Sequence, residues 1–392
     1  MTQWRIGFGM AGSPKAPAGA RLCALAAFGL LALSACARPE GVLVPVAVGD
    51  APGTRVDMLV ATTRAPSAAT GVVFSGERGD GLAFADVAVS VPRDRPVGSV
   101  QWPSGPNGDP AREFVVTRLD PLQRTGIPAW FKARHGQKRR VLVFVHGFNT
   151  RFDASVFGYA QFIADTDASL VPVLFSWPSR GRVTDYVYDR ESANFSRSDL
   201  AYVLGTAAAS PKVDEVVVMA HSMGAWLAVE ALRQLALKDG RVPAKITNVV
   251  LASPDLDIDV FERQVQELGP KRPKITIFVS RNDKALGLSR FIAGQVTRVG
   301  AVDLNDPQYA ARLERARDIT VVDLTALQGG DALNHSVFAT QADIVQLIGA
   351  RLSGGQELGE EQGLVARVGG GVGSAVGAVA AAPILVFTGG RN

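Results

Sequence analysis

The sequence has few of the residues on which several kinds of active site depend. Its 392 residues include only two cysteines and four histidines. Cys23 lies in an apolar N-terminal stretch and Cys36 follows it, so an exported, processed chain would keep no thiol for a disulfide, a metal site or a nucleophile. Neither an HExxH nor a GxxxxGK[ST] pattern occurs. We therefore expect no metal and no organic cofactor.

Acidic residues are absent from the first 35 positions, whereas Arg5, Lys15 and Arg21 lie there. Without these three cations the net charge of +4 falls to +1. The basic balance is therefore a targeting feature, and we expect no nucleic-acid partner. With 47% hydrophobic and 20% charged residues, the composition is typical of a globular protein with a sizeable core.

The N-terminus is predicted to be an export signal. Residues 22–33 read LCALAAFGLLAL, which is short for a membrane span and suits the apolar region of a signal peptide. The stretch ends in LSAC at 33–36, which resembles the bacterial lipobox. That resemblance implies cleavage after residue 35 and lipid attachment at Cys36, in the cell membrane or the outer membrane, with a periplasmic folded domain. An ordinary secretory signal with an incidental Cys36 is the alternative.

Hydrophobic patterns divide the rest of the chain. We predict a tether at residues 36–55 and one folded domain at 56–352. A Gly/Ala-rich tail follows at 353–392, and it either packs as a small-residue helix or stays flexible. Short β-branched runs at 56–60, 84–91 and 113–117 indicate an antiparallel edge. Continuous apolar runs then alternate with helical patterns, which predicts an α/β fold with a mostly parallel sheet covered on both faces. These runs lie at 141–145, 171–175, 216–219, 246–252, 275–279 and 319–324.

The stretch VVVMAHSMGAWLA at 216–228 joins one of these runs to a helical pattern through Ser222. A nucleophilic serine on an α/β sheet needs such a tight strand-to-helix turn, with small neighbours. Ala220 and Gly224 are both small. We therefore predict that Ser222 is a nucleophile and that the Met223 N–H faces the developing oxyanion. The alternative is that Ser222 is only a small residue at the junction.

A second motif carries a family resemblance. The run at 141–145 is followed by His146, Gly147, Phe148 and Asn149. Together with AHSMG at 220–224, this order resembles the α/β-hydrolase superfamily over most of 140–350. It is most similar to a bacterial esterase/lipase-like group with HGFN and HSMG motifs. The resemblance implies an α/β-hydrolase fold, a second oxyanion donor at the Phe148 N–H, and an Asn149 that braces this loop.

The general base is predicted by elimination. His135 lies in a basic segment, residues 132–140, and His146 and His221 belong to the two motifs. His335 is the one histidine downstream of Ser222, between the last predicted strand and a helix, as the superfamily order of serine, acid and histidine requires.

The acid has two candidates. Asp283 follows the run at 275–279, the usual place for the acid, although it could be a turn residue. Asp255 follows the run at 246–252 and could instead cap the helix expected at 260–267. We favour Asp283.

These motifs predict a membrane-anchored serine hydrolase that cleaves a lipid or another small acyl ester through an acyl-enzyme. Two alternatives remain open. The scaffold could be a non-catalytic envelope lipoprotein that binds a ligand, or an amidase or thioesterase with the same triad.

Overall fold

The computed structural model describes residues 39–49, 53–135, 139–166, 169–316, 318–327, 331–354 and 385–388. The predicted signal peptide, Cys36 and most of the predicted tail lie outside these ranges. In the described residues no helix is both long enough and apolar enough to cross a membrane.

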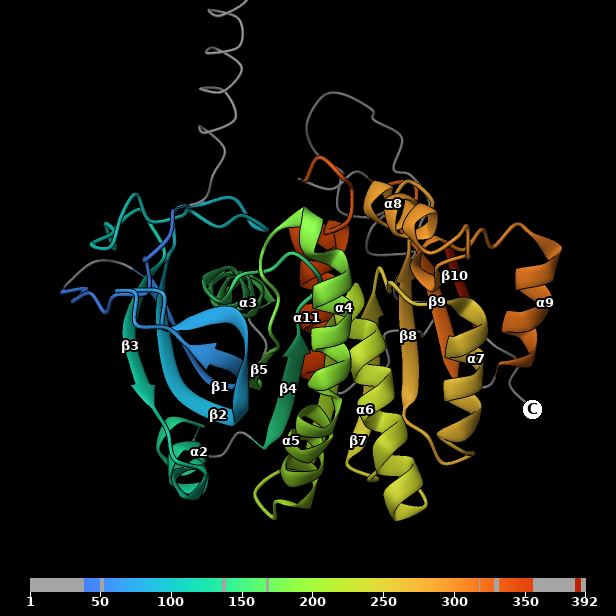
Figure 1. Ribbon diagram of the computed structural model, residues 1–392, viewed down its shortest axis with the longest axis horizontal. Coiled ribbons are helices and arrows are strands. Elements are labelled where there is room, and N and C mark those ends of the chain that lie inside the picture. The colour runs from blue at the N-terminus through green and yellow to red at the C-terminus, as the bar shows by residue number, and fades with distance from the viewer. Residues whose placement is uncertain are drawn as a thin grey trace, which may run out of the picture. The chain divides into compact units, whose positions relative to one another are not determined.

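One ten-stranded sheet organises the described residues, in the order β10-β9-β8-β7-β6-β4-β5-β1-β2-β3 (Figure 1). Its strands are β1 (Gly53–Pro66), β2 (Phe74–Pro92), β3 (Val115–Pro121), β4 (Arg140–Val145), β5 (Val171–Ser176), β6 (Glu215–His221), β7 (Ile246–Ala252), β8 (Lys274–Val279), β9 (Ile319–Asp323) and β10 (Leu385–Thr388). Pairing is parallel from β1 through β5, β4, β6, β7 and β8 to β9. It is antiparallel between β1 and β2, β2 and β3, and β9 and β10. The predicted parallel sheet with an antiparallel N-terminal edge is confirmed.

Helices cover both faces of this sheet. The α-helices are α2 (Ile127–His135), α3 (Phe152–Thr166), α4 (Tyr186–Phe195), α5 (Arg197–Ala209), α6 (Met223–Asp239), α7 (Ile258–Glu267), α8 (Lys284–Ile292), α9 (Pro307–Arg315), α10 (Val337–Thr340) and α11 (Ala342–Gly354). Short 3-10 turns are η1 (Arg124–Gly126), η2 (Val183–Asp185) and η3 (Val299–Ala301). In Figure 1, α4 to α7 lie on the near face, and α3 and α11 on the far face.

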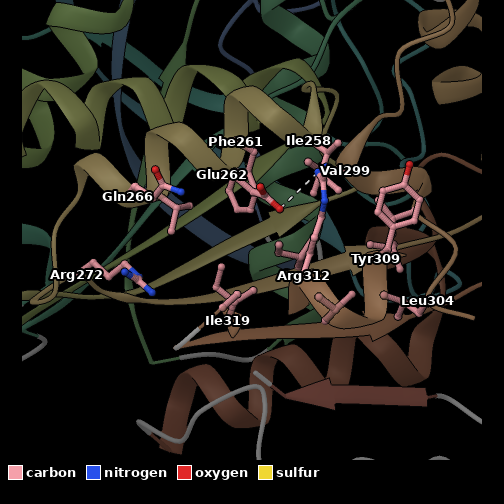
Figure 2. Close-up of a pocket in the computed structure, with 16 residues that line it drawn as sticks. Ile258, Phe261, Glu262, Gln266, Arg272, Val299, Leu304, Tyr309, Arg312 and Ile319 are labelled. Atoms are coloured by element: carbon pink, nitrogen blue, oxygen red, sulfur yellow. Dashed lines mark ion pairs between the residues drawn. The ribbon is translucent and has the colours of Figure 1, made fainter. Parts of the chain in front are cut away.

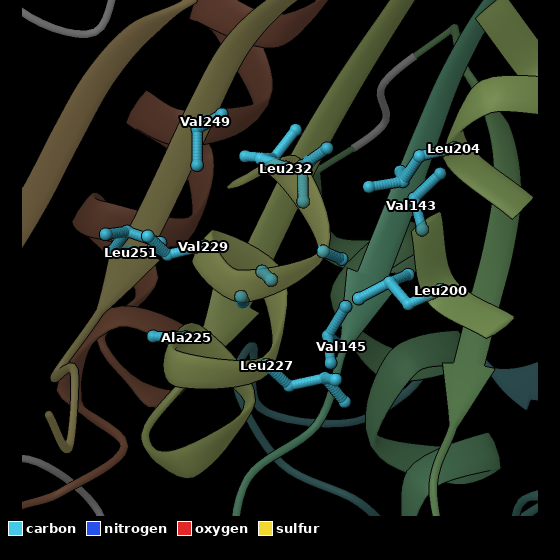
Figure 3. Packing of buried hydrophobic residues seen from close by; sticks show 14 of the residues in the cluster. Val143, Val145, Leu200, Leu204, Ala225, Leu227, Val229, Leu232, Val249 and Leu251 are labelled. Carbon is cyan, nitrogen blue, oxygen red and sulfur yellow. The ribbon is translucent and has the colours of Figure 1, made fainter. Parts of the chain in front are cut away.

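The continuous apolar runs follow from this double cover. Along β6, Val216 and Val218 pack into the core beneath α5 and α6, while Val217 and Met219 pack into the core beneath α3 and α11. Successive strand residues point to opposite faces, so a strand buried on both sides has no polar position. Figure 3 shows the first core, where Leu227 of α6 and Leu200 of α5 meet β4. Truncating one of these leucines to alanine should cost about 2–5 kcal/mol of stability.

Several segments differ from the expectation. Within the basic segment 132–140, α2 extends to His135 and β4 begins at Arg140. The predicted C-terminal tail contributes strand β10 at the sheet edge. Its glycine-rich part, 369–377, lies outside the described residues, so the two alternatives given for it, a small-residue helix and a flexible tail, both stay predictions.

Candidate active site

Ser222 lies on the sharp turn between β6 and α6. Its backbone has φ 53° and ψ −124°, a conformation that is sparsely populated by residues other than glycine. The Ser222 N–H donates to the Ala252 carbonyl (3.0 Å), and the Asp255 N–H donates to the Ser222 carbonyl (3.1 Å). The end of β7 and the loop that follows it thus hold the strained turn. The predicted elbow geometry is present.

Two glycines bring the loop after β4 against this elbow. A Cβ on Gly147 would lie 2.9 Å from both His221 Nδ1 and Ser222 Cβ. A Cβ on Gly224 would lie 2.3 Å from the His146 carbonyl oxygen. The backbone at both glycines therefore approaches its neighbours more closely than any other residue would allow. The HGF and HSMG motifs, which lie far apart in the sequence, form one site, and Phe148 follows the glycine that touches Ser222.

Asp283 and His335 form a hydrogen-bonded pair. His335 Nδ1 lies 2.6 Å from Asp283 Oδ2, and the Asp283 side chain has no exposed surface. The other oxygen, Oδ1, accepts the Leu286 N–H at the start of α8 (3.0 Å). Asp283 is therefore both a helix cap and the partner of His335. The Asp331 carboxylate fixes the histidine loop by accepting the N–H groups of His335 (3.1 Å) and Ser336 (2.8 Å).

His221 links the serine elbow to the histidine loop. Its Nε2 lies 3.3 Å from the His335 carbonyl oxygen, to which it donates, and the two rings have centroids 4.6 Å apart. Burial lowers the pKa of His221 well below its usual value, and the charge of His335 adds to this effect. A neutral His221 with its proton on Nε2 makes this hydrogen bond, because the carbonyl oxygen can only accept.

The competing acid, Asp255, occupies a separate buried network. Its oxygens accept hydrogen bonds from Tyr186 (3.0 Å) and Ser289, and Arg298 Nε lies 3.3 Å away. The expected helix-capping role of Asp255 is wrong, because Asp257 caps α7 by accepting the N–H groups of Asp259 and Val260. Asp255 therefore neither caps α7 nor contacts the histidine. Asp257 caps the helix, and Asp283 forms the hydrogen bond with His335.

Arg64 and Asp189, which belong to no recognisable sequence motif, hold the HGFN loop. Arg64 is 1% exposed, and its guanidinium reaches His146 and the Thr150 carbonyl oxygen. Asp189 Oδ2 accepts the Asn149 N–H (3.2 Å), and burial raises the pKa of this carboxyl. Asn149 has φ 56°, which asparagine tolerates better than most residues. It therefore contributes to the loop through its backbone.

A cavity of about 410 Å³ lies away from these residues. It is lined by residues of α7, η3, α9, β8 and β9, is mainly apolar, and has the Arg312–Glu262 ion pair on its wall (Figure 2). None of the predicted site residues lines it. Within the described ranges no group of three or more histidine, cysteine, aspartate or glutamate side chains could hold a metal ion.

The sheet, its covering helices and the serine elbow define an α/β hydrolase. Residues 124–351 match the model of the family described as "Alpha/beta hydrolase of unknown function (DUF900)", and the chain belongs to this family. The resemblance seen in the sequence is confirmed at the level of superfamily and fold. No curated protein matches the chain.

Solved structures with low identity are also similar to the chain. A hyperthermophilic esterase from the archaeon Pyrobaculum calidifontis is 12% identical to this chain, with a TM-score of 0.33. The aligned region covers 70% of this chain and 82% of the esterase. A putative cell surface hydrolase from Lactobacillus plantarum WCFS1 is 10% identical to this chain, with a TM-score of 0.33. The aligned region covers 56% of this chain and 94% of the hydrolase.

Proposed function

We propose that the chain is a membrane-anchored serine hydrolase that cleaves carboxylic esters. The observation that carries this proposal is the hydrogen bond between His335 Nδ1 and Asp283 Oδ2, beside the strained turn that presents Ser222. The pairing orients the imidazole and leaves its Nε2 atom for the serine. A serine, a carboxylate and an imidazole in this chain order form the triad that acyl transfer requires.

The first half of the reaction forms an acyl-enzyme. Ser222 Oγ attacks the ester carbonyl carbon while His335 Nε2 takes the hydroxyl proton. Asp283 stabilises the resulting imidazolium. The carbonyl oxygen becomes an oxyanion that accepts hydrogen bonds from the N–H groups of Phe148 and Met223. When the carbon–oxygen ester bond breaks, His335 returns its proton to the leaving alcohol.

Water completes the cycle. His335 takes a proton from water, the hydroxide attacks the acyl carbon, and the second tetrahedral intermediate collapses. The proton returns to Ser222 Oγ, and the carboxylic acid is released. Every proton is held by His335, Ser222, water or product, so this chemistry needs no metal or cofactor.

The test compares two buried serines at the ends of parallel strands. Ser222 follows β6, and Ser253 follows β7 with a similarly positive φ of 46°. Hydrolysis of p-nitrophenyl esters of increasing acyl length should fall at least 10⁴-fold in Ser222→Ala, whereas Ser253→Ala should stay within a few-fold of wild type. Ester hydrolysis that survives Ser222→Ala would contradict the proposal, as would a folded wild type that cleaves no ester in the panel. Matched amide and thioester substrates in that panel then decide the class of leaving group.

Membrane attachment is proposed from the LSAC sequence at 33–36, outside the described residues. Lipid at Cys36 would keep the hydrolase domain close to a lipid ester, because each buried CH₂ contributes about 0.8 kcal/mol to membrane binding. Wild-type protein expressed with a radiolabelled fatty acid should carry the label and sediment with membranes. Cys36→Ser should remain unlabelled. Equal labelling of both proteins would refute acylation at this cysteine.

A further inference from the structure

Arg64 is a buried cation from a strand outside the region that matches the family model. It lies on β1, and the match begins at residue 124. Its Nη1 donates to the Ser75 carbonyl (3.1 Å) and the Ser179 carbonyl (2.9 Å), and its Nε donates to Ser176 Oγ (2.9 Å). Burial lowers the pKa of Arg64 to about 9, and the nearby Asp189 and Asp153 charges partly offset this effect. It is therefore a cation at neutral pH.

The remaining nitrogen, Nη2, connects Arg64 to the HGFN loop. It lies 3.3 Å from His146 Nε2 and 2.7 Å from the Thr150 carbonyl oxygen. A guanidinium can only donate hydrogen bonds. His146 Nε2 must therefore be the acceptor, without a proton of its own, and the single proton of the neutral imidazole must lie on Nδ1.

The other side of the same ring requires the same tautomer. His146 Nδ1 lies 2.8 Å from the Gly147 carbonyl oxygen, which can only accept. Burial lowers the pKa of His146 to about 3, with the charge of Arg64 as the next cause, so the ring stays neutral. It stacks on Trp177, whose indole N–H donates to the His146 carbonyl oxygen (2.8 Å). The ring is thus fixed in both its orientation and its proton position.

The Gly147 carbonyl and the Phe148 N–H belong to one peptide unit. A trans peptide is planar and directs its C=O and N–H to opposite sides. When His146 Nδ1–H holds the Gly147 oxygen, the Phe148 N–H must point the other way. Gly147 packs against Ser222, so a rotation of this peptide would redirect the oxyanion donor that is proposed for the reaction.

We propose that Arg64 is a positioning residue that selects the Nδ1–H tautomer of His146 and thereby fixes the Gly147–Phe148 peptide with its N–H available to the oxyanion. This inference rests on the proposed function, because it assigns the Phe148 N–H to transition-state binding. It also makes the β1–β2 hairpin a working part of the active site. Lysine could not replace Arg64, because one ammonium cannot reach the spread of acceptors that the planar guanidinium contacts.

The first experiment measures kcat and KM for Arg64→Met, with Arg55→Met as the matched control on the same strand. Arg55 is an exposed partner of Asp57. Loss of one oxyanion donor lowers kcat by about 10²–10³-fold, so Arg64→Met should show this fall with KM changed by less than about threefold. Arg55→Met should match wild type. Unchanged kcat in folded Arg64→Met would overturn the proposal.

A second pair of variants tests the relay if Arg64→Met fails to fold. The amide nitrogen of asparagine falls near the position of a histidine Nδ1 and can donate to the Gly147 oxygen, whereas leucine cannot. His146→Asn should therefore keep kcat within about tenfold of wild type, and His146→Leu should lose about 10²-fold or more. Equal kcat values for these two variants would show that the donor at this position has no role.

The tautomer can be read without any activity. With four histidines in the chain, ¹⁵N-histidine labelling and NMR should give a protonated Nδ1 and an unprotonated Nε2 at His146. Arg64→Met should lose this preference. A protonated Nε2 in wild type refutes the relay whatever the protein hydrolyses. If Ser222→Ala abolishes hydrolysis while Arg64→Met does not affect it, the relay is wrong and the serine mechanism stands.

Discussion

Ser222→Gly should stabilise the fold while it removes the nucleophile. The Ser222 backbone, at φ 53° and ψ −124°, lies where a Cβ atom causes strain of about 1–3 kcal/mol. Glycine relieves this strain, but it costs about 0.5–1 kcal/mol relative to alanine because the unfolded chain gains freedom. The net expectation is that Ser222→Gly is about 1 kcal/mol more stable than Ser222→Ala.

Urea unfolding followed by circular dichroism measures this difference. Both variants lack the hydroxyl, so the comparison isolates the backbone. A control pair at Ser210, where φ is −65°, should show the opposite order, with glycine less stable than alanine by about 0.5–1 kcal/mol. If Ser222→Gly is no more stable than Ser222→Ala, the turn is not strained and Ser222 does not have the elbow backbone described above.

Three further predictions follow from the packing and charges. Gly224→Ala should reduce ester hydrolysis at least 100-fold, because the new Cβ would lie 2.3 Å from the His146 carbonyl oxygen and displace the elbow. The control Gly158→Ala, whose Cβ would have nothing within 4 Å, should retain wild-type rates. Asp283→Asn should lower kcat about 10³–10⁴-fold, whereas Asp255→Asn should mainly lower stability by leaving its buried arginine partner unpaired. As the pH falls from 6.5 to about 3, His146 should lower the free energy of unfolding by up to about 1.4 kcal/mol per pH unit, because only the unfolded chain binds that proton. In urea titrations, His146→Asn should reduce the measured slope by this amount, while His221, whose pKa is also lowered, keeps its own contribution.

The central strands could be predicted because a strand that is buried on both faces has a continuous run of apolar residues in the sequence. The runs at 141–145 and 246–252 match β4 and β7 to within one residue. By contrast, β10 is a four-residue strand at the edge of the sheet, and its place depends on pairing with β9 rather than on its own pattern. The N-cap of α7 was misassigned because Asp255 and Asp257 lie two residues apart, and only the backbone geometry separates them.

The site was predictable where chain order and residue scarcity limit the choice. His335 followed from the small number of histidines, and the structure pairs it with Asp283, the preferred of two candidate acids. Arg64 could not be found, because an arginine in a polar stretch gives no sign that it will be buried. Its acceptors come from residues 75, 146, 150, 176 and 179, which only the folded chain brings together. Asp189 escaped notice for the same reason.

The central claim is that Ser222 is an activated nucleophile. The most direct test is to treat the folded protein with a fluorophosphonate and to locate the adduct by peptide mass spectrometry, with Ser222→Ala and His335→Ala beside wild type. Wild type should carry one phosphonylated residue, Ser222, whereas Ser222→Ala should carry no adduct and His335→Ala should be labelled much more slowly. An adduct on another serine, or a folded wild-type protein that does not react, would contradict it.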